Sequence, residues 1–161
     1  MPPARAHFKR MSSARDPYTL QRFVEAQRGV YAQAQAELRA GRKQSHWMWF
    51  IFPQIKGLGR SAMAQKYAIS SVAEATEYLN HPELGKRLRE CTQLVTAIDG
   101  RSIEDIFGYP DHLKFHSSIT LFAHATNDNQ VFMEALRKYY RSEFDHRTQS
   151  VLRRGVTPGS Q

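Results

Sequence analysis

The chain of 161 residues has little cysteine: Cys91 is its only one. A disulfide framework and a zinc site of cysteine pairs are therefore excluded. The chain also lacks a secretory leader pattern and any apolar run close to the ~18–20 residues of a membrane span. We expect a cytoplasmic protein with no membrane association, and a length that fits one domain.

Acidic residues are fewer than basic ones, 15 Asp and Glu against 23 Lys and Arg, and the formal net charge is +8. The excess lies at the ends, since residues 1–15 carry four basic residues and no acid, and Arg153 and Arg154 lie near the other end. Residues 16–149 hold 17 basic and 15 acidic residues. A body so close to neutral suits duplex DNA poorly, so we expect nucleic-acid contact only through the tails.

Strand-like alternation is scarce, and residues 16–154 have mostly helical periodicity. Apolar residues recur at three- and four-residue spacing from Thr19 to Ala40, which predicts one long helix ended by Gly41. Further helices are expected at about 111–124, 129–141 and 145–153. The sequence predicts a mainly α fold, a single compact domain of about six to eight helices over 16–154, with disordered tails at 1–15 and 155–161.

Three serines are placed to begin helices. Ser71 and Glu74 have the spacing of a capping box, in which the serine oxygen accepts the third amide of the helix. Ser102 precedes Asp105 at the same spacing, and Ser61 follows a glycine-containing turn. Each is expected at the N-cap of a helix.

Aromatic residues are concentrated in one segment. Five rings, counting a histidine, fall within seven positions: His46, Trp47, Trp49, Phe50 and Phe52. Pro53 disfavours a helix through the residues before it, which predicts a buried, extended segment near 46–55. In that conformation alternate side chains face opposite sides, so both sides need cover. Two interpretations stay open: a core plug of the domain, or the wall of a ligand pocket.

Polar groups beside the rings favour a pocket. Apolar walls with a few converging polar groups are typical of small-molecule sites, and flat rings suit a planar base. The turn at 56–61 contains two glycines, which let backbone amides approach an anion such as phosphate, although an ordinary connection explains them too. The ligand-binding residues expected are Lys43, Trp47, Trp49, Gln54, Arg60, Ser61, Lys114 and Ser117.

Four stretches of the chain resemble the DUF1810 family of uncharacterised bacterial and fungal proteins. They read DPYTLQRFVEAQ, GRKQSHWMWFIFPQIKGLGRS, YAISSVAEATEYLNHPELGKRL and IFGYPDHLKFHSSITLF, and the resemblance covers nearly all of 16–152. Some members bear the label calpastatin, but nothing in this chain looks like an inhibitor repeat. The resemblance implies a mainly helical single domain and no settled activity.

The layout is more distantly similar to the NADAR (YbiA-like) superfamily, which is linked to N-glycosidic cleavage of riboflavin precursors and ADP-ribose conjugates. The points of similarity are Glu25 with Gln27, the HPELGKRL segment, and the run from Asp105 to Gly108. Such a reaction needs a carboxylate near an oxocarbenium-like centre and a proton carrier. The resemblance implies Glu25, Asp105 or Asp111 as the acid and His46 as the proton carrier.

Two functions remain in view. The first is a pocket protein that binds, or binds and hydrolyses, a nucleotide-like N-glycoside of the NAD, ADP-ribose or riboflavin-precursor type. The alternative is a non-enzymatic module whose basic tails contact an acidic protein or RNA. We expect no cofactor and no metal: His112 and His116 have zinc-compatible spacing, but the sequence offers no evident third ligand. Cys91 lies on an apolar stripe and is expected to be a buried structural thiol.

Overall fold

The computed structural model describes the backbone of residues 16–159 and the side chains of residues 16–154. The expected tail at 1–15 lies outside the described residues. Helices make up nearly all the regular structure of the described range. They are α2 (Gln21–Gln27), α3 (Tyr31–Arg39), α4 (Met48–Ile51), α5 (Ala62–Lys66), α6 (Val72–Asn80), α7 (Leu84–Thr96), α8 (Ile103–Phe107), α9 (Asp111–His124), α10 (Gln130–Tyr140) and α11 (His146–Gly159).

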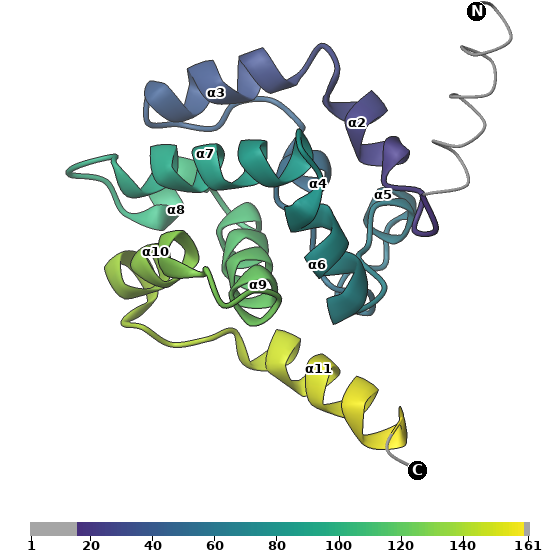
Figure 1. The fold of residues 1–161 in the computed structure, drawn as a ribbon. Coiled ribbons are helices and arrows are strands. Elements are labelled where there is room, and N and C mark those ends of the chain that lie inside the picture. Colours follow the sequence, from purple (N-terminus) through teal and green to yellow (C-terminus); the bar gives the residue numbers. More distant parts are fainter. Residues whose placement is uncertain (1–15, 160–161) are drawn as a thin grey trace, which may run out of the picture.

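Helix α9 is the centre of the domain, and α6, α8, α10 and α11 pack against it (Figure 1). Residues 117–123 of this helix are all buried, and Phe115, Ile119, Leu121 and Phe122 are fully buried. A helix buried on every side needs neighbours on every side. The mainly α, single-domain prediction is confirmed, with ten helices in the described residues rather than six to eight.

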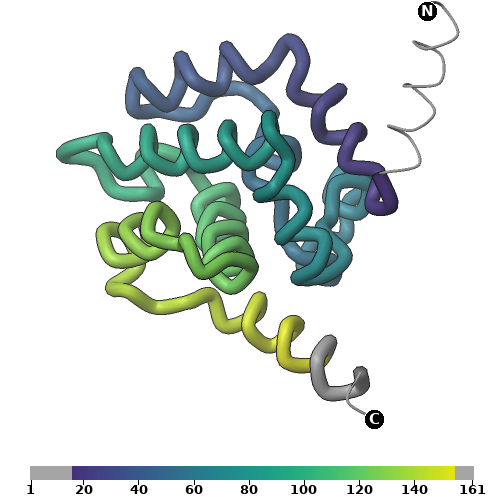
Figure 2. Tube along the Cα trace, viewed as in Figure 1, coloured from purple at the N-terminus to yellow at the C-terminus, as the bar shows by residue number. Residues whose placement is uncertain are grey.

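The chain trace in Figure 2 shows α11 leaving the rest of the domain at one corner. This helix runs to Gly159, past the boundary expected at residue 154. Asp145 stands before its first residue and accepts hydrogen bonds from the Thr148 amide (2.9 Å) and hydroxyl (2.6 Å). This is the pattern of an N-cap. In the described part of the chain, no helix is both long and apolar enough to cross a membrane.

The prediction of one helix from Thr19 to Ala40 is wrong. The chain forms α2 and α3, separated by residues 28–30, where Gly29 has a φ of +80°. Left-handed backbone of this kind suits glycine, which has no Cβ to clash. The hydrophobic period continues through the break because both helices bury one face against the same core.

The three serine caps are confirmed. The hydroxyls of Ser61, Ser71 and Ser102 each accept a hydrogen bond from the amide three residues ahead, at 3.1 Å in every case. The Glu74 carboxylate does not return to Ser71, as a full capping box requires. It accepts from the amide and hydroxyl of Ser70, both at 2.8 Å.

The aromatic segment is buried as expected, but it is only partly extended. Residues 48–51 form a single helical turn, α4, and the chain straightens after Phe52. Ile55 then makes an isolated parallel bridge with Ile69, through the Lys56 amide to the Ile69 carbonyl (2.7 Å) and the Ile69 amide to the Gln54 carbonyl (2.8 Å). The helical turn ends just before Pro53, so the missing amide of that proline breaks no helical hydrogen bond.

Candidate functional site

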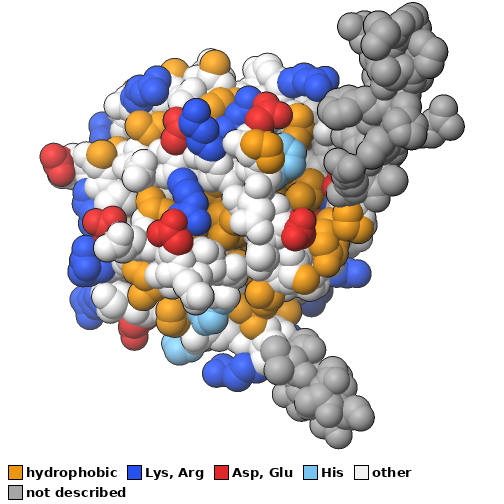
Figure 3. All heavy atoms as spheres, in the orientation of Figure 1, with side chains coloured by type: hydrophobic (Ala, Val, Ile, Leu, Met, Phe, Trp, Pro, Cys, Tyr) orange, Lys and Arg blue, Asp and Glu red, His pale blue; other side chains and the backbone are white. Residues whose placement is uncertain are grey.

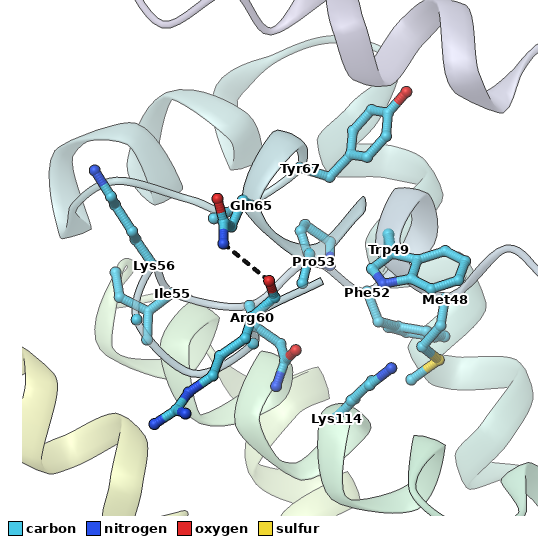
Figure 4. Close-up of a pocket in the computed structure, with 15 residues that line it drawn as sticks. Met48, Trp49, Phe52, Pro53, Ile55, Lys56, Arg60, Gln65, Tyr67 and Lys114 are labelled. Atoms are coloured by element: carbon cyan, nitrogen blue, oxygen red, sulfur yellow. Dashed lines mark hydrogen bonds between the residues drawn. The ribbon is translucent and has the colours of Figure 1, made fainter. Parts of the chain in front are cut away.

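A cavity of about 430 Å³ lies between α4, the segment that follows it, α5 and α9 (Figure 4). This volume lies within the range of small-molecule sites. One wall is apolar and rich in rings. Its members are Met48, Trp49, Phe52, Pro53, Ile55 and Tyr67. The α4 turn and the straight segment after it therefore bring the aromatic run to the cavity.

Of the described residues that line the cavity, three are cationic and none is acidic. Lys114 comes from α9, whereas Lys56 and Arg60 come from the turn before α5. Figure 4 shows the Lys114 ammonium beside Met48 and Phe52, with Lys56 and Arg60 reaching out on the opposite side. The Lys114 Nζ is 5.2 Å from the centre of the Trp49 ring, a cation–π distance.

Trp49 is half-buried and lines the cavity. Its indole Nε1 is shielded from solvent, and no acceptor for it is found among the described residues. A buried donor without a partner costs on the order of 1–3 kcal/mol. Trp49 thus contributes its ring to the cavity wall, while its N–H is closed to solvent and has no partner among the described residues.

The turn at 56–61 is shaped by two glycines. Gly57 has a φ of +103°, and a Cβ added to Gly59 would lie 2.6 Å from the Cβ of Ala64. Real Cβ atoms do not approach so closely, so only glycine fits at position 59. From outside, Arg147 on α11 donates to the Leu58 carbonyl at 3.1 Å. The rim of the cavity is therefore held both by close packing and by a distant helix.

Arg22 on α2 holds the part of the cavity wall that contains Tyr67. Its guanidinium donates to the carbonyls of Lys66 (2.9 Å) and Ala68 (2.8 Å), on either side of Tyr67. It also pairs with Glu74 at 3.0 Å. Because a guanidinium offers donors in a rigid fork, one residue can hold two carbonyls and a carboxylate at once. Tyr67 is thereby kept against the cavity.

Glu37 on α3 organises the segment that leads into α4. Its carboxylate, on a residue only 6% exposed, accepts from the amides of Gln44 (2.8 Å) and Ser45 (3.0 Å), the Ser45 hydroxyl, Gln33 Nε2 (2.9 Å) and Trp47 Nε1 (2.9 Å). Burial alone would raise the pKa of Glu37, but the hydrogen bonds from Ser45, Gln44 and Gln33 outweigh it and lower the pKa to about 2. The sequence analysis did not single this residue out.

Asp111, the first residue of α9, bridges two lysines. Its Oδ2 is 2.8 Å from Lys43 Nζ, and its Oδ1 is 3.6 Å from Lys114 Nζ. The Lys43 side chain is 7% exposed, and the Lys114 side chain is 27% exposed. Lys43 is thus separated from the cavity by one carboxylate and one lysine.

Half of the eight expected ligand-binding residues line the cavity: Trp49, Gln54, Arg60 and Lys114. Trp47, by contrast, is 1% exposed and belongs to the core, where its indole nitrogen serves Glu37. Ser61 is an exposed helix cap. Ser117 is buried, and its hydroxyl donates to Asp145 (3.1 Å), which joins α9 to the start of α11.

None of the three expected catalytic residues lines the cavity. Glu25, His46 and Asp105 are all exposed, on α2, before α4 and on α8 respectively. Helical periodicity gave no means to place them relative to the pocket. Of the acids considered, Asp111 is the one in contact with a lining residue.

Other lining residues escaped the sequence analysis. Tyr67 and Gln65 belong to this group, and Gln65 Nε2 donates to the Arg60 carbonyl at 2.9 Å (Figure 4). They lie on or just after α5, a helix of five residues with no buried side chain of its own. The sequence has no apolar periodicity there, so it gave no indication that Gln65 and Tyr67 line a cavity. Among residues 16–154, no three His, Cys, Asp or Glu side chains are grouped to hold a metal.

Comparison with known proteins yields a family and one close structural relative. The chain is similar to the conserved hypothetical protein Rv1873 from Mycobacterium tuberculosis, whose crystal structure is known. The two sequences are 58% identical, the match covers 85% of this chain and 98% of that protein's chain, and the TM-score is 0.84. No curated protein matches the chain. The family model described as "Protein of unknown function (DUF1810)" matches residues 17–152. The chain belongs to the DUF1810 family.

Proposed function

We propose that the cavity binds a small anion with a flat ring, and that a nucleotide-like N-glycoside of the NAD, ADP-ribose or riboflavin-precursor type is the favoured class. One observation carries the proposal. A wall of rings and three cationic side chains enclose the same space, without an acidic residue among the described residues that line it.

The two halves of such a ligand match the two kinds of lining residue. A planar ring gains apolar contact with Phe52, Tyr67 and Trp49. A phosphate gains from Lys114, and from Lys56 and Arg60 at the rim. Like-signed charges in a concave site with apolar walls concentrate the opposite ion.

Binding is favoured over hydrolysis. Cleavage of an N-glycoside needs a carboxylate positioned at the reacting carbon or its attacking water. The described lining residues include none, and Glu25 and Asp105 lie outside the lining. Asp111, an acid in contact with the lining residue Lys114, also pairs with Lys43.

The binding test uses the tryptophan emission, since Trp49 lines the cavity and Trp47 is shielded in the core. AMP, ADP-ribose and NAD are expected to change the emission and to raise the melting temperature. At a ligand concentration of about a hundred times Kd, the folded state gains about 2.7 kcal/mol of stability. Adenosine and ribose 5-phosphate, each with half of the determinants, are expected to bind more weakly. The absence of any response across this panel would refute the proposal.

The matched variants are Lys114→Met and Lys86→Met. Lys114 lines the cavity, whereas Lys86 is an exposed residue of α7 outside it. We expect the first variant to weaken AMP binding and the second to leave it unchanged. Equal affinities in both would show that AMP binds elsewhere on this basic protein.

Turnover is tested separately by incubating the protein with NAD and ADP-ribose and separating the products by chromatography. We expect no release of nicotinamide or free ribose compounds. Product that appears with the native chain and disappears with Asp111→Asn, but persists with Glu25→Gln and Asp105→Asn, would replace simple binding with hydrolysis at Asp111.

A further inference from the structure

Asp111 shares its charge unequally between two lysines. The Lys43 ammonium is the closer partner, at 2.8 Å, and the Lys43 side chain is only 7% exposed. The Lys114 ammonium is 3.6 Å away, beyond ordinary hydrogen-bond length, and partly exposed beside the cavity. One contact is tight and shielded, while the other is loose and open to exchange.

The tight contact does not depend on the cavity. The Lys43 amide donates to the Ile106 carbonyl at 2.7 Å, and the two residues that follow are held by Glu37. The Lys43 Nζ also lies 5.2 Å from the centre of the Trp47 ring in the core. Lys43 is thus fixed from three directions, and Asp111 keeps a buried counter-ion whatever Lys114 does.

From this asymmetry we infer that Asp111 sets how strongly the cavity prefers anions: it lowers the positive charge of the empty cavity and releases Lys114 to an incoming anion. The inference rests on the proposed function. Removing one partner of a buried carboxylate is costly when the charge is left alone. Here Lys43 stays, so Lys114 can turn to a ligand without leaving Asp111 unpaired.

The consequence is that Asp111 moderates the preference of the cavity for charged ligands. A phosphate monoester competes with a carboxylate for an ammonium, whereas an uncharged nucleoside does not. Asp111 also repels every anion that approaches Lys114, so its loss is expected to tighten AMP binding and leave adenosine unchanged. A residue with only a structural role would weaken both when replaced.

The charge beside Trp49 can be measured without any nucleotide. Iodide, an anion, and acrylamide, a neutral molecule, both quench exposed tryptophan, and Trp49 is the accessible one of the two tryptophans. At constant ionic strength, the ratio of the iodide to the acrylamide quenching constant measures the local charge beside Trp49. Asp111→Asn is expected to raise this ratio about two- to fivefold at low salt, since unit charges ~4 Å apart interact appreciably even in water. High salt should remove most of the difference.

Two further variants test whether the quenching ratio follows the sign of the charge that is removed. Lys43→Met, which leaves Asp111 with Lys114 alone, is expected to lower the ratio, and the double variant Lys43→Met/Asp111→Asn to return it towards the native value. Lys86→Met should not change it. An unchanged or lower ratio in folded Asp111→Asn overturns the inference. If the ratio rises while AMP does not bind the native chain, Asp111 does lower the positive charge of the cavity, but the proposed class of ligand is wrong.

Discussion

Glu37 is buried and negatively charged, and its replacement by glutamine is the sharpest test of how the site is held. Glutamine keeps the size of the side chain but replaces one acceptor oxygen with an NH₂ donor. The native carboxylate accepts five hydrogen bonds, from three backbone or hydroxyl groups of residues 44–45 and from the Gln33 and Trp47 side chains. An NH₂ group at either oxygen position faces donors, so buried donors lose their acceptor.

The magnitude follows from the pKa of Glu37, which folding lowers from 4.5 to about 2. A shift of this size corresponds to about 3 kcal/mol of stability when the group is buried. Because the folded-state pKa is the lower one, this stability is fully present above pH 4.5 and is lost as the pH falls towards 2. We therefore expect Glu37→Gln to cost about 3 kcal/mol at pH 7 and progressively less below pH 4.5.

Urea unfolding followed by circular dichroism, at pH 7 and at steps from 5 to 2, measures this difference. Glu25→Gln is the matched control, because Glu25 is exposed on α2 and makes none of these contacts. The control should unfold like the native chain at each pH. A Glu37→Gln chain as stable as the native one at pH 7, or a deficit that does not shrink in acid, would refute the hydrogen-bonding account.

Two further substitutions test the neighbouring structure. Trp47→Ala should cost about 3–5 kcal/mol in urea unfolding, since the largest ring of the core is removed and Glu37 loses a donor; a loss under 1 kcal/mol would contradict its place in the core. Gly59→Ala should lower stability by about 1–3 kcal/mol, because the added methyl overlaps Ala64. In thermal melts, the double variant Gly59→Ala/Ala64→Gly should recover the part of that loss that comes from the overlap, less the ~1 kcal/mol that a glycine costs within α5.

Sequence periodicity predicted the parts of the fold in which helices bury one continuous face. The helix expected at about 111–124 is α9, Asp111–His124, which begins directly after Pro110. The break at Gly29 was missed, since apolar residues resume in phase after it. The conformation of the aromatic run was missed too: alternation and a short helical turn are both compatible with rings at 47, 49 and 52.

The candidate site was predicted only where residues were notable by type. Trp49, Gln54, Arg60 and Lys114 stand in or near unusual stretches, and they line the cavity. Glu37 had no such signal, because an acid between Ala34 and Leu38 on an amphipathic helix looks like an ordinary solvated residue. Four of its five hydrogen bonds come from residues seven to ten positions further on, in a loop whose path the sequence does not specify.

The α4 turn and the residue before it contribute to the core and to the cavity wall at once. Trp47 enters the core and is fixed by Glu37, and two residues later Trp49 stands at the cavity beside Lys114. Lys43, which holds Asp111, is fixed by the same loop that Glu37 organises. Loosening Glu37 should therefore displace the ring wall and the charge beside it together. A Glu37→Gln chain that still folds is expected to lose affinity for AMP as well as stability, which would tie the buried carboxylate to the ligand through the loop it holds.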